Sequence, residues 1–321
     1  MKKKININSI RNDKTFSEGF DEFLRYCKIR SLREASIESY LDTIKYTWYK
    51  FYSEDNLIRN INEEVMDDFV LFLKTNTKQQ DSSISSHLKR MRTILNYFMK
   101  LGYMEKFVIK NIKTNKNLIE TYTDSEIQIL LKKPDLKKCS FIEYRNWTIV
   151  NFFLAAGCRV STLINIRIKD LDFENDLIYY IHTKNRRKHV VPMSKTLKEV
   201  LIEYITYRQA ESNEDYLFVS AYGDKCNRMT LSDSMNQYNR KRGVMQTGVH
   251  KYRHTFAKKW ILAGGNVFKL QKILQHATME MVKNYVNIFN AEIVSDFDEF
   301  NRLEQLQSKT KQHISLKGGK K

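Results

Sequence analysis

The sequence predicts a mainly α-helical protein of two domains, with a small β-hairpin or sheet in the second. Three observations favour this class. Only two prolines and ten glycines interrupt the 321 residues, apolar residues recur at helical spacing through the first third, and only one later pair of segments has the pattern of a hairpin. A chain of this length can bury a separate core in each of two domains.

The first third of the chain predicts a helical domain over residues 15–105, preceded by a basic segment over residues 1–14. Phe16–Ile29 is amphipathic, and Ala35–Tyr52 carries apolar residues at helical spacing. Asn62 is placed to cap a third helix, and Asp81 or Ser82 to open a fourth. Together these segments predict an all-helical unit.

A second domain is predicted over residues 119–306. The segment before it, residues 106–118, is rich in lysine and has no acidic residue, which is typical of a linker able to follow a phosphate backbone. Thr123 and Glu126 form a capping-box pattern at the start of the domain. Residues 176–182 and 189–193 predict the hairpin. The basic tail, residues 307–321, is expected to be disordered.

The charge balance points to a polyanionic partner. The chain has 55 Lys and Arg against 37 Asp and Glu, a formal net charge of +18. Each phosphate that a cation neutralises releases counterions, so nucleic acid is the leading candidate, ahead of an incidentally basic surface. The fourth predicted helix carries Lys89, Arg90 and Arg92 opposite its apolar stripe. These three side chains either face solvent or lie along DNA phosphates, and the sequence leaves both interpretations open.

Cysteine usage and hydropathy favour a cytoplasmic protein without a membrane segment. The four cysteines are scattered and form no CxxC pair, which argues against a zinc knuckle and favours a reducing compartment. The longest apolar run, residues 147–158, is too short to span a bilayer, and the basic start lacks the apolar region of a signal peptide.

The segment HKYRHTF raises the question of a metal site. His250 and His254 have the i, i+4 spacing of a helical zinc pair, but Lys251 follows the first histidine and no third ligand of suitable spacing appears. His254 is then a satisfied histidine in the helix interior. His250 and Arg253 are three residues apart and share a helix face. An arginine fork beside an imidazole suits a phosphate better than a metal.

Other segments offer complementary groups. Arg159 follows a glycine and an apolar run, where a cation needs an anionic partner. Lys184 lies at the tip of the predicted hairpin, beside Arg186 and Arg187, which are further candidates for DNA contact. His276 precedes Tyr285 by nine residues. A single residue of any of these kinds is more often a packing or surface residue. It is the order of the whole set along the chain that indicates a functional site.

Taken together, these motifs resemble those of the tyrosine recombinases of the phage integrase family over roughly residues 15–305. GCRVSTL contains the first arginine, TKNRRKHVVPM the hairpin lysine, HKYRHTF the His-x-x-Arg pair, and LQH stands nine residues before the tyrosine. The helical first third is similar to the core-binding domain of that family, although no motif there is diagnostic.

The resemblance implies a site-specific recombinase or integrase that cleaves and rejoins DNA without metal, cofactor or ATP. Tyr285 would form a 3′-phosphotyrosyl bond, Arg159 and Arg253 would brace the phosphate, and Lys184 would protonate the departing 5′ oxygen. His250 would act as acid and base toward the tyrosine proton, and His276 would hydrogen-bond the phosphate. The partners implied are a double-stranded recombination site and a homotetramer, acting on the nucleoid of a prokaryotic host. Residues 291–306 either form a helix exchanged between protomers or pack on their own domain.

Two positions depart from the family pattern. Thr162 stands where an acidic residue usually follows the first arginine, and Gln275 stands where glycine usually precedes the second histidine. Two alternatives therefore remain: a type IB-like DNA topoisomerase, and a DNA-binding protein that keeps the recombinase fold without catalysis.

Overall fold

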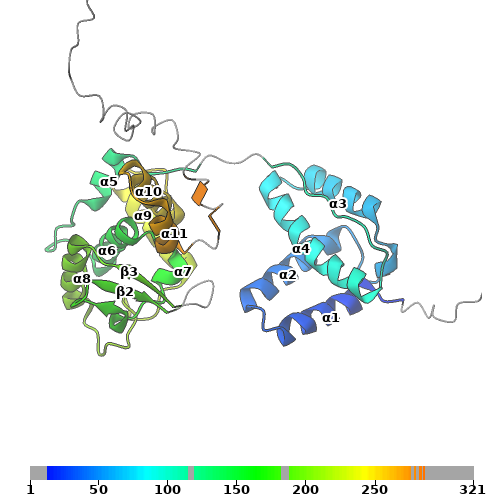
Figure 1. Ribbon diagram of the computed structural model, residues 1–321, viewed down its shortest axis with the longest axis horizontal. Coiled ribbons are helices and arrows are strands. Elements are labelled where there is room, and N and C mark those ends of the chain that lie inside the picture. Colours follow the sequence, from blue (N-terminus) through cyan, green and yellow to red (C-terminus); the bar gives the residue numbers. More distant parts are fainter. Residues whose placement is uncertain are drawn as a thin grey trace, which may run out of the picture. The chain divides into compact units, whose positions relative to one another are not determined.

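The computed structural model describes residues 13–114, 119–181, 188–275, 278–279, 282–283 and 285. The chain divides into two compact units, Met1–Asn117 and Leu118–Lys321 (Figure 1). The predicted fold class is confirmed, because helices dominate both units and the only sheet of the described residues lies in the second. No helix in the described ranges is long and apolar enough to cross a membrane.

The first unit is helical throughout. Its elements are α1 (Phe16–Ile29), α2 (Glu34–Tyr46), η1 (Trp48–Lys50), η2 (Ile58–Asn60), α3 (Glu63–Asn76) and α4 (Asp81–Leu101). The Thr15 side chain accepts a hydrogen bond from the Glu18 backbone N–H, and the Glu18 carboxylate accepts one from the Thr15 backbone N–H, so a capping box begins α1. Asn62 caps α3 as predicted, by accepting from the Val65 N–H.

The prediction of one continuous helix over Ala35–Tyr52 is wrong. The α-helix ends at Tyr46, and Thr47 leaves helical geometry with φ −128° and ψ −59°. This break turns the Trp48 ring into the core, where its centroid lies 5.4 Å from that of Phe16 and 4.9 Å from that of Phe69. Burying so large an aromatic ring outweighs the helical hydrogen bonds that are lost.

The second unit is built around α6 (Phe141–Ala156), which is buried on nearly every side and packs against four other helices. The helices of this unit are α5 (Asp124–Leu131), α6, α7 (Val160–Leu163), η3 (Ile168–Asp170), α8 (Lys195–Arg208), α9 (Arg228–Lys241), α10 (Val249–Leu262) and α11 (Val267–Leu274). The Thr123–Glu126 capping box at the start of α5 is confirmed. Because α10 packs directly on α6, the central helix supports the segment that carries His250 and Arg253.

The predicted hairpin is confirmed and is part of a three-stranded antiparallel sheet, β1 (Leu171–Asp172), β2 (Leu177–Tyr180) and β3 (His189–Pro192), in that order. Ile178 pairs with Val191 in β3 and with Leu171 in β1. The two-residue strand β1 was not predicted, because it is too short to show an alternating pattern.

Candidate active site

The turn after α6 sets the position of the first arginine. Gly157 ends the helix with φ 57°, in the left-handed region that favours glycine. A Cβ at this position would lie 2.4 Å from Cδ1 of Phe256 and 2.9 Å from Cδ2 of Leu274. The missing side chain therefore lets α10 and the end of α11 approach the turn, and Arg159 follows as the N-cap residue of α7.

Arg253 is anchored by two backbone carbonyl groups. Its side chain is buried on α10, with 5% of its surface exposed. Nη1 donates to the Gly157 carbonyl over 2.8 Å, and Nη2 donates to the Leu274 carbonyl over 2.5 Å. The guanidinium group therefore joins the turn after α6, helix α10 and the end of α11, and its orientation is fixed before any substrate binds.

Arg159 lies in the same site and is half-buried. Its Nη2 lies 3.5 Å from the Gln275 carbonyl, at the limit of a hydrogen bond. Within the described part of the chain, the acceptors of Arg159 and Arg253 are backbone carbonyls and the Tyr285 hydroxyl, and not carboxylates. The positive charge of the pair is therefore not neutralised by an acid among these residues, which suits a site for an anion.

Both guanidinium groups keep their charge at neutral pH. Burial, followed by the positive charge of Arg159, lowers the pKa of Arg253 to about 10. Burial also lowers the pKa of Arg159 from its ordinary value. Each group remains protonated across the physiological range, so the site presents two fixed cations.

Tyr285 lies beside the arginines within the same chain. Its side chain is 4% exposed and packs with Ala257, Leu270, Leu274 and Val282. Burial raises the pKa of its hydroxyl, while the charge and hydrogen bond of Arg253 and the charge of Arg159 act in the opposite direction. The hydroxyl also lies 2.8 Å from Nδ1 of His254. The structure therefore brings Arg159, Arg253 and Tyr285 of one protomer together.

His250 lies in the first turn of α10 and is exposed. Partial loss of solvent lowers its pKa, and the positive charges of Arg228, Arg253 and Arg159 lower it further. The imidazole is therefore neutral at pH 7 and can accept a proton. Arg228, the first residue of α9, was not singled out by its sequence context; only the fold brings it near His250.

Helix α10 is held in place by a buried polar chain. The Tyr252 hydroxyl donates to Oδ1 of Asn239 over 2.6 Å, and Nδ2 of Asn239 donates to the Tyr122 hydroxyl over 2.8 Å. These contacts link α10 to α9 and to the segment before α5. They fix the helix that carries three of the site side chains, His250, Arg253 and His254.

Four predicted residues lie outside the described residues: Lys184, Arg186, Arg187 and His276. The two residues that depart from the family pattern, Thr162 and Gln275, are both among the described residues. Thr162 is buried in α7. Gln275 ends α11 with φ 54°, a conformation that costs more for glutamine than for the glycine usual there.

The three basic residues predicted on α4 have different surroundings. Lys89 is exposed. Arg90 lies 3.3 Å from Oγ1 of Thr43, and both line a groove between α2 and α4 that also includes His87. Arg92 donates to the Ile109 carbonyl and, over 2.8 Å, to Oδ1 of Asn111, so its guanidinium group also holds the segment that follows α4.

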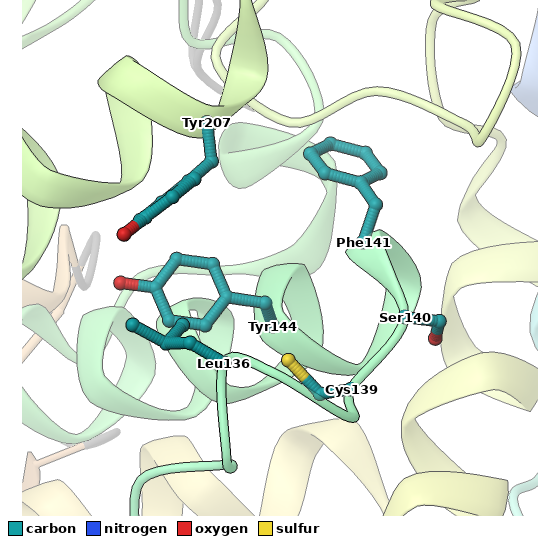
Figure 2. A pocket seen from close by; sticks show the side chains of 6 residues that line it. All are labelled: Leu136, Cys139, Ser140, Phe141, Tyr144 and Tyr207. Carbon is teal, nitrogen blue, oxygen red and sulfur yellow. The ribbon is translucent and has the colours of Figure 1, made fainter.

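A hollow of about 210 Å³ occurs elsewhere in the second unit, between the segment before α6, α6 itself and α8 (Figure 2). It is lined by Leu136, Cys139, Ser140, Phe141, Tyr144 and Tyr207, none of which is a predicted site residue. Among the described residues, no group of three His, Cys, Asp or Glu side chains is placed to hold a metal ion.

Comparison with protein families matches both units. Residues 120–292 match the phage integrase family, and residues 49–116 match the phage integrase SAM-like domain. A tyrosine recombinase of Pseudothermotoga lettingae is 25% identical over 293 residues, which cover 90% of this chain and 98% of the relative. The tyrosine recombinase XerD of Staphylococcus epidermidis is 24% identical, covering 88% of this chain and 97% of the relative.

Solved structures share the fold. The Tn1549 transposon integrase in complex with transposon right end DNA superposes with a TM-score of 0.70 at 15% identity, covering 88% of this chain and 99% of that one. A lambda integrase tetramer bound to a Holliday junction gives a TM-score of 0.68 at 14% identity, covering 85% and 78%.

The chain belongs to the phage integrase family, as the resemblance predicted. Within that family it is a site-specific DNA recombinase of the tyrosine type.

Proposed function

We propose that Tyr285 is the nucleophile of this recombinase and acts in the active site of its own protomer. The observation that supports this most directly is the buried hydroxyl of Tyr285, which interacts with Arg253 and Arg159 of the same chain. A phosphate held between the two guanidinium groups would lie next to that hydroxyl. Catalysis would then begin without a large movement of the tyrosine.

The proposed reaction conserves the bond energy of the DNA. The phenolic oxygen of Tyr285 attacks the phosphorus, and the bond from phosphorus to the 5′ oxygen breaks, which leaves a 3′-phosphotyrosyl intermediate. His250 takes the phenolic proton, and Lys184 gives a proton to the departing 5′ oxygen. Arg159 and Arg253 stabilise the negative charge that grows on the non-bridging oxygens, and His276 hydrogen-bonds the phosphate. Rejoining is the reverse reaction and needs neither ATP nor a metal ion.

The charge distribution supports a phosphate ligand. The positive charges of Arg159 and Arg253 repel one another. Among the described residues their acceptors are backbone carbonyls and a phenol, which carry no compensating negative charge. A phosphodiester supplies the negative charge that would relieve this repulsion, and its oxygens match the planar forks of arginine.

The partner proposed is a double-stranded recombination site. The net charge of +18 favours a long polyanion. Lys89 and Arg90 beside the α2–α4 groove, together with Arg92, Arg186 and Arg187, are candidates for contacts with the DNA backbone. A tetramer is the proposed working assembly, since the lambda integrase structure similar to this chain is a tetramer bound to a Holliday junction. Such a reaction on a mobile DNA element would occur on the nucleoid, in the cytoplasm.

The test is covalent trapping on nicked suicide duplexes made from the DNA that flanks the gene. We expect wild-type protein to form an adduct that survives denaturation. Tyr285→Phe should bind the same duplex with unchanged affinity and form no adduct, because only the nucleophilic oxygen is missing. Tyr207→Phe, on the exposed face of α8, is the matched control and should trap DNA as the wild type does.

Other results would favour the alternatives. Binding without any adduct would indicate a DNA-binding protein that has lost catalysis. Adducts on duplexes of random sequence, with relaxation of supercoils and no strand exchange, would indicate a topoisomerase.

A further inference from the structure

The first turn of α10 is not held by a cap of its own. Gly248 stands at the N-cap position with φ 155° and has no side chain that could accept a hydrogen bond from the first N–H groups of the helix. Glycine also permits more backbone conformations than other residues. The local sequence therefore leaves the start of the helix weakly determined, although His250 lies within this turn.

Tyr122 holds this turn from a distant part of the sequence. Its hydroxyl donates to the Gly248 carbonyl over 3.3 Å and accepts from Nδ2 of Asn239 over 2.8 Å. Its ring centroid lies 4.8 Å from Nζ of Lys251 and 4.6 Å from the ring centroid of Tyr252. Three positions at the start of α10 therefore contact one side chain, which is itself 2% exposed.

The directions of these hydrogen bonds follow from their partners. A carbonyl oxygen can only accept and Nδ2 of Asn239 can only donate, so the Tyr122 hydroxyl gives its proton to Gly248. Burial raises the pKa of Tyr122 to about 12, so the hydroxyl keeps this proton at neutral pH. The same carbonyl accepts from the Lys251 backbone N–H over 3.0 Å, which closes the first turn. Tyr122 thus binds where the helix begins.

The turn held by Tyr122 carries His250 toward the arginines. His250 and Arg253 are three residues apart and share a helix face. Besides burial, the positive charges of Arg228, Arg253 and Arg159 act on the pKa of the imidazole. The two carbonyls that anchor Arg253 fix α10 one turn further along, beyond its start. The position of His250 relative to the arginines therefore depends on the first turn.

We propose that Tyr122 is a positioning residue, whose hydroxyl and ring hold the first turn of α10 and thereby place His250 beside Arg159 and Arg253. This role rests on the proposed participation of His250 in the reaction, but not on which proton the imidazole handles. Tyr122 belongs to the segment by which the chain enters the second unit, which begins at Leu118. A residue outside every catalytic motif would then determine where a catalytic group lies.

The test compares the loss of two buried hydroxyl groups. Tyr122→Phe removes the hydroxyl and keeps the ring. Tyr238→Phe is the matched control, because Tyr238 is 4% exposed and its hydroxyl donates to the Leu130 carbonyl over 2.9 Å, away from the first turn of α10. The measurements are the single-turnover rate of adduct formation at saturating nicked duplex, the duplex affinity and the melting temperature. Both variants are also made in a His250→Ala background.

We expect Tyr122→Phe to form the adduct about tenfold more slowly than Tyr238→Phe, a fraction of the roughly 100-fold loss caused by a misplacement of about 1 Å. Its affinity for the duplex should remain that of the wild type, because no charge is changed. His250→Ala should itself be slower by about 100-fold or more. In that background Tyr122→Phe should add less than about a twofold loss, because the group that Tyr122 places is gone.

Equal rates of adduct formation in Tyr122→Phe and Tyr238→Phe would overturn the proposal. So would the same loss with and without His250, since Tyr122 would then stabilise the unit as a whole. If Tyr122→Phe does not fold, Gly248→Ala strains the same turn at φ 155°, while its Cβ meets only Cβ of Lys251 at 3.8 Å. Its loss of rate should depend on His250 in the same way.

Two single variants, tested in parallel, separate this proposal from that of the nucleophile. An adduct formed by Tyr285→Phe would count against the nucleophile alone. A wild-type rate in His250→Ala would count against the roles of His250 and Tyr122, and not against Tyr285.

Discussion

Two arginines of the catalytic unit are almost equally buried, yet they have opposite surroundings. Arg145 on α6 is 4% exposed and Arg253 on α10 is 5% exposed. The Arg145 pocket, formed with Asn146, Val219, Cys226 and Ser234, offers an acceptor to every nitrogen of the guanidinium group. The Arg253 site offers two carbonyls and the hydroxyl of a tyrosine.

Burial alone therefore does not distinguish an arginine that is proposed to be catalytic from a structural one. Both side chains lack a carboxylate partner within the described residues, and both have a pKa lowered by burial. Arg145 uses its donors to join α6, α9 and the segment before it, which is a structural task. Arg253 has a second cation, Arg159, and the proposed nucleophile, Tyr285, as neighbours. What surrounds the buried charge therefore distinguishes the two roles.

The largest expected effect comes from replacing each arginine by methionine. Arg145→Met leaves Oδ1 of Asn146 and the Val219 carbonyl without the donor they have in the wild type, which should cost about 3 kcal/mol of unfolding free energy. Arg253→Met removes a charge that repels Arg159, so its stability should change by less than about 2 kcal/mol. Its rate of adduct formation should fall by at least about a thousandfold, because it loses a transition-state donor.

Urea denaturation and suicide-duplex trapping measure the two quantities, with Arg145→Met trapping assayed at a temperature where it is folded. The comparison fails if Arg145→Met loses trapping while folded, or if Arg253→Met unfolds and Arg145→Met does not.

A smaller effect concerns acid, because only the Arg253 site holds histidines. The pKa of His254 is about 4 in the folded chain, below the ordinary unfolded value of about 6.5. Between these values the unfolded chain binds a proton that the folded chain does not, so stability is full above pH 6.5 and declines as the pH falls. After allowance for partial exposure, His254→Asn should reduce the stability lost between pH 7 and pH 5 by about 1 kcal/mol.

Denaturation of the full chain at both pH values tests this expectation. Ser234→Ala, in the Arg145 pocket, is the control and should leave the pH dependence as it is in the wild type. If His254→Asn and the wild type lost the same stability between pH 7 and pH 5, the lowered pKa of His254 would not account for the acid sensitivity.

The smallest expected effect is a gain in stability next to Arg159. Gln275 holds a left-handed conformation at the end of α11, and its carbonyl accepts from Arg159. Gln275→Gly should raise the unfolding free energy by about 0.5–1 kcal/mol, since glycine adopts this conformation without strain. Gln209→Gly, at φ 51° at the end of α8, should give a similar gain. A melting temperature lowered by Gln275→Gly would show that the glutamine side chain stabilises the turn.

Local patterns were sufficient to predict much of this molecule. The capping residues Asn62 and Thr123, the apolar face of Phe16–Ile29 and the hairpin depend on neighbours within a few residues, so sequence spacing reveals them. The break at Thr47 could not be predicted, because it depends on rings of α1 and α3 that accommodate Trp48.

The same limit applies to the site. Arg159, His250, Arg253 and Tyr285 were predicted as site residues because their motifs occur in order, and the fold brings Arg159, Arg253 and Tyr285 together. The contact of His254 with Tyr285 and the proximity of Arg228 to His250 were not predicted, since both depend on the packing of distant segments. Nor did the sequence distinguish Arg145 from a surface arginine, because its acceptors come from residues 219, 226 and 234.

The absence of a side chain at Gly157 has a consequence for how this enzyme can vary. One hydrogen atom at that position allows the Gly157 carbonyl to reach Arg253 while the ring of Phe256 lies against the turn. Any larger group would collide with Phe256 of α10 and Leu274 of α11 and push both helices away from the turn after α6. Position 157 should therefore tolerate fewer substitutions than many exposed Lys and Arg positions, although Gly157 has no reactive group. A substitution there would inactivate the enzyme by displacing the arginine side chains, while every reactive group remained in the sequence.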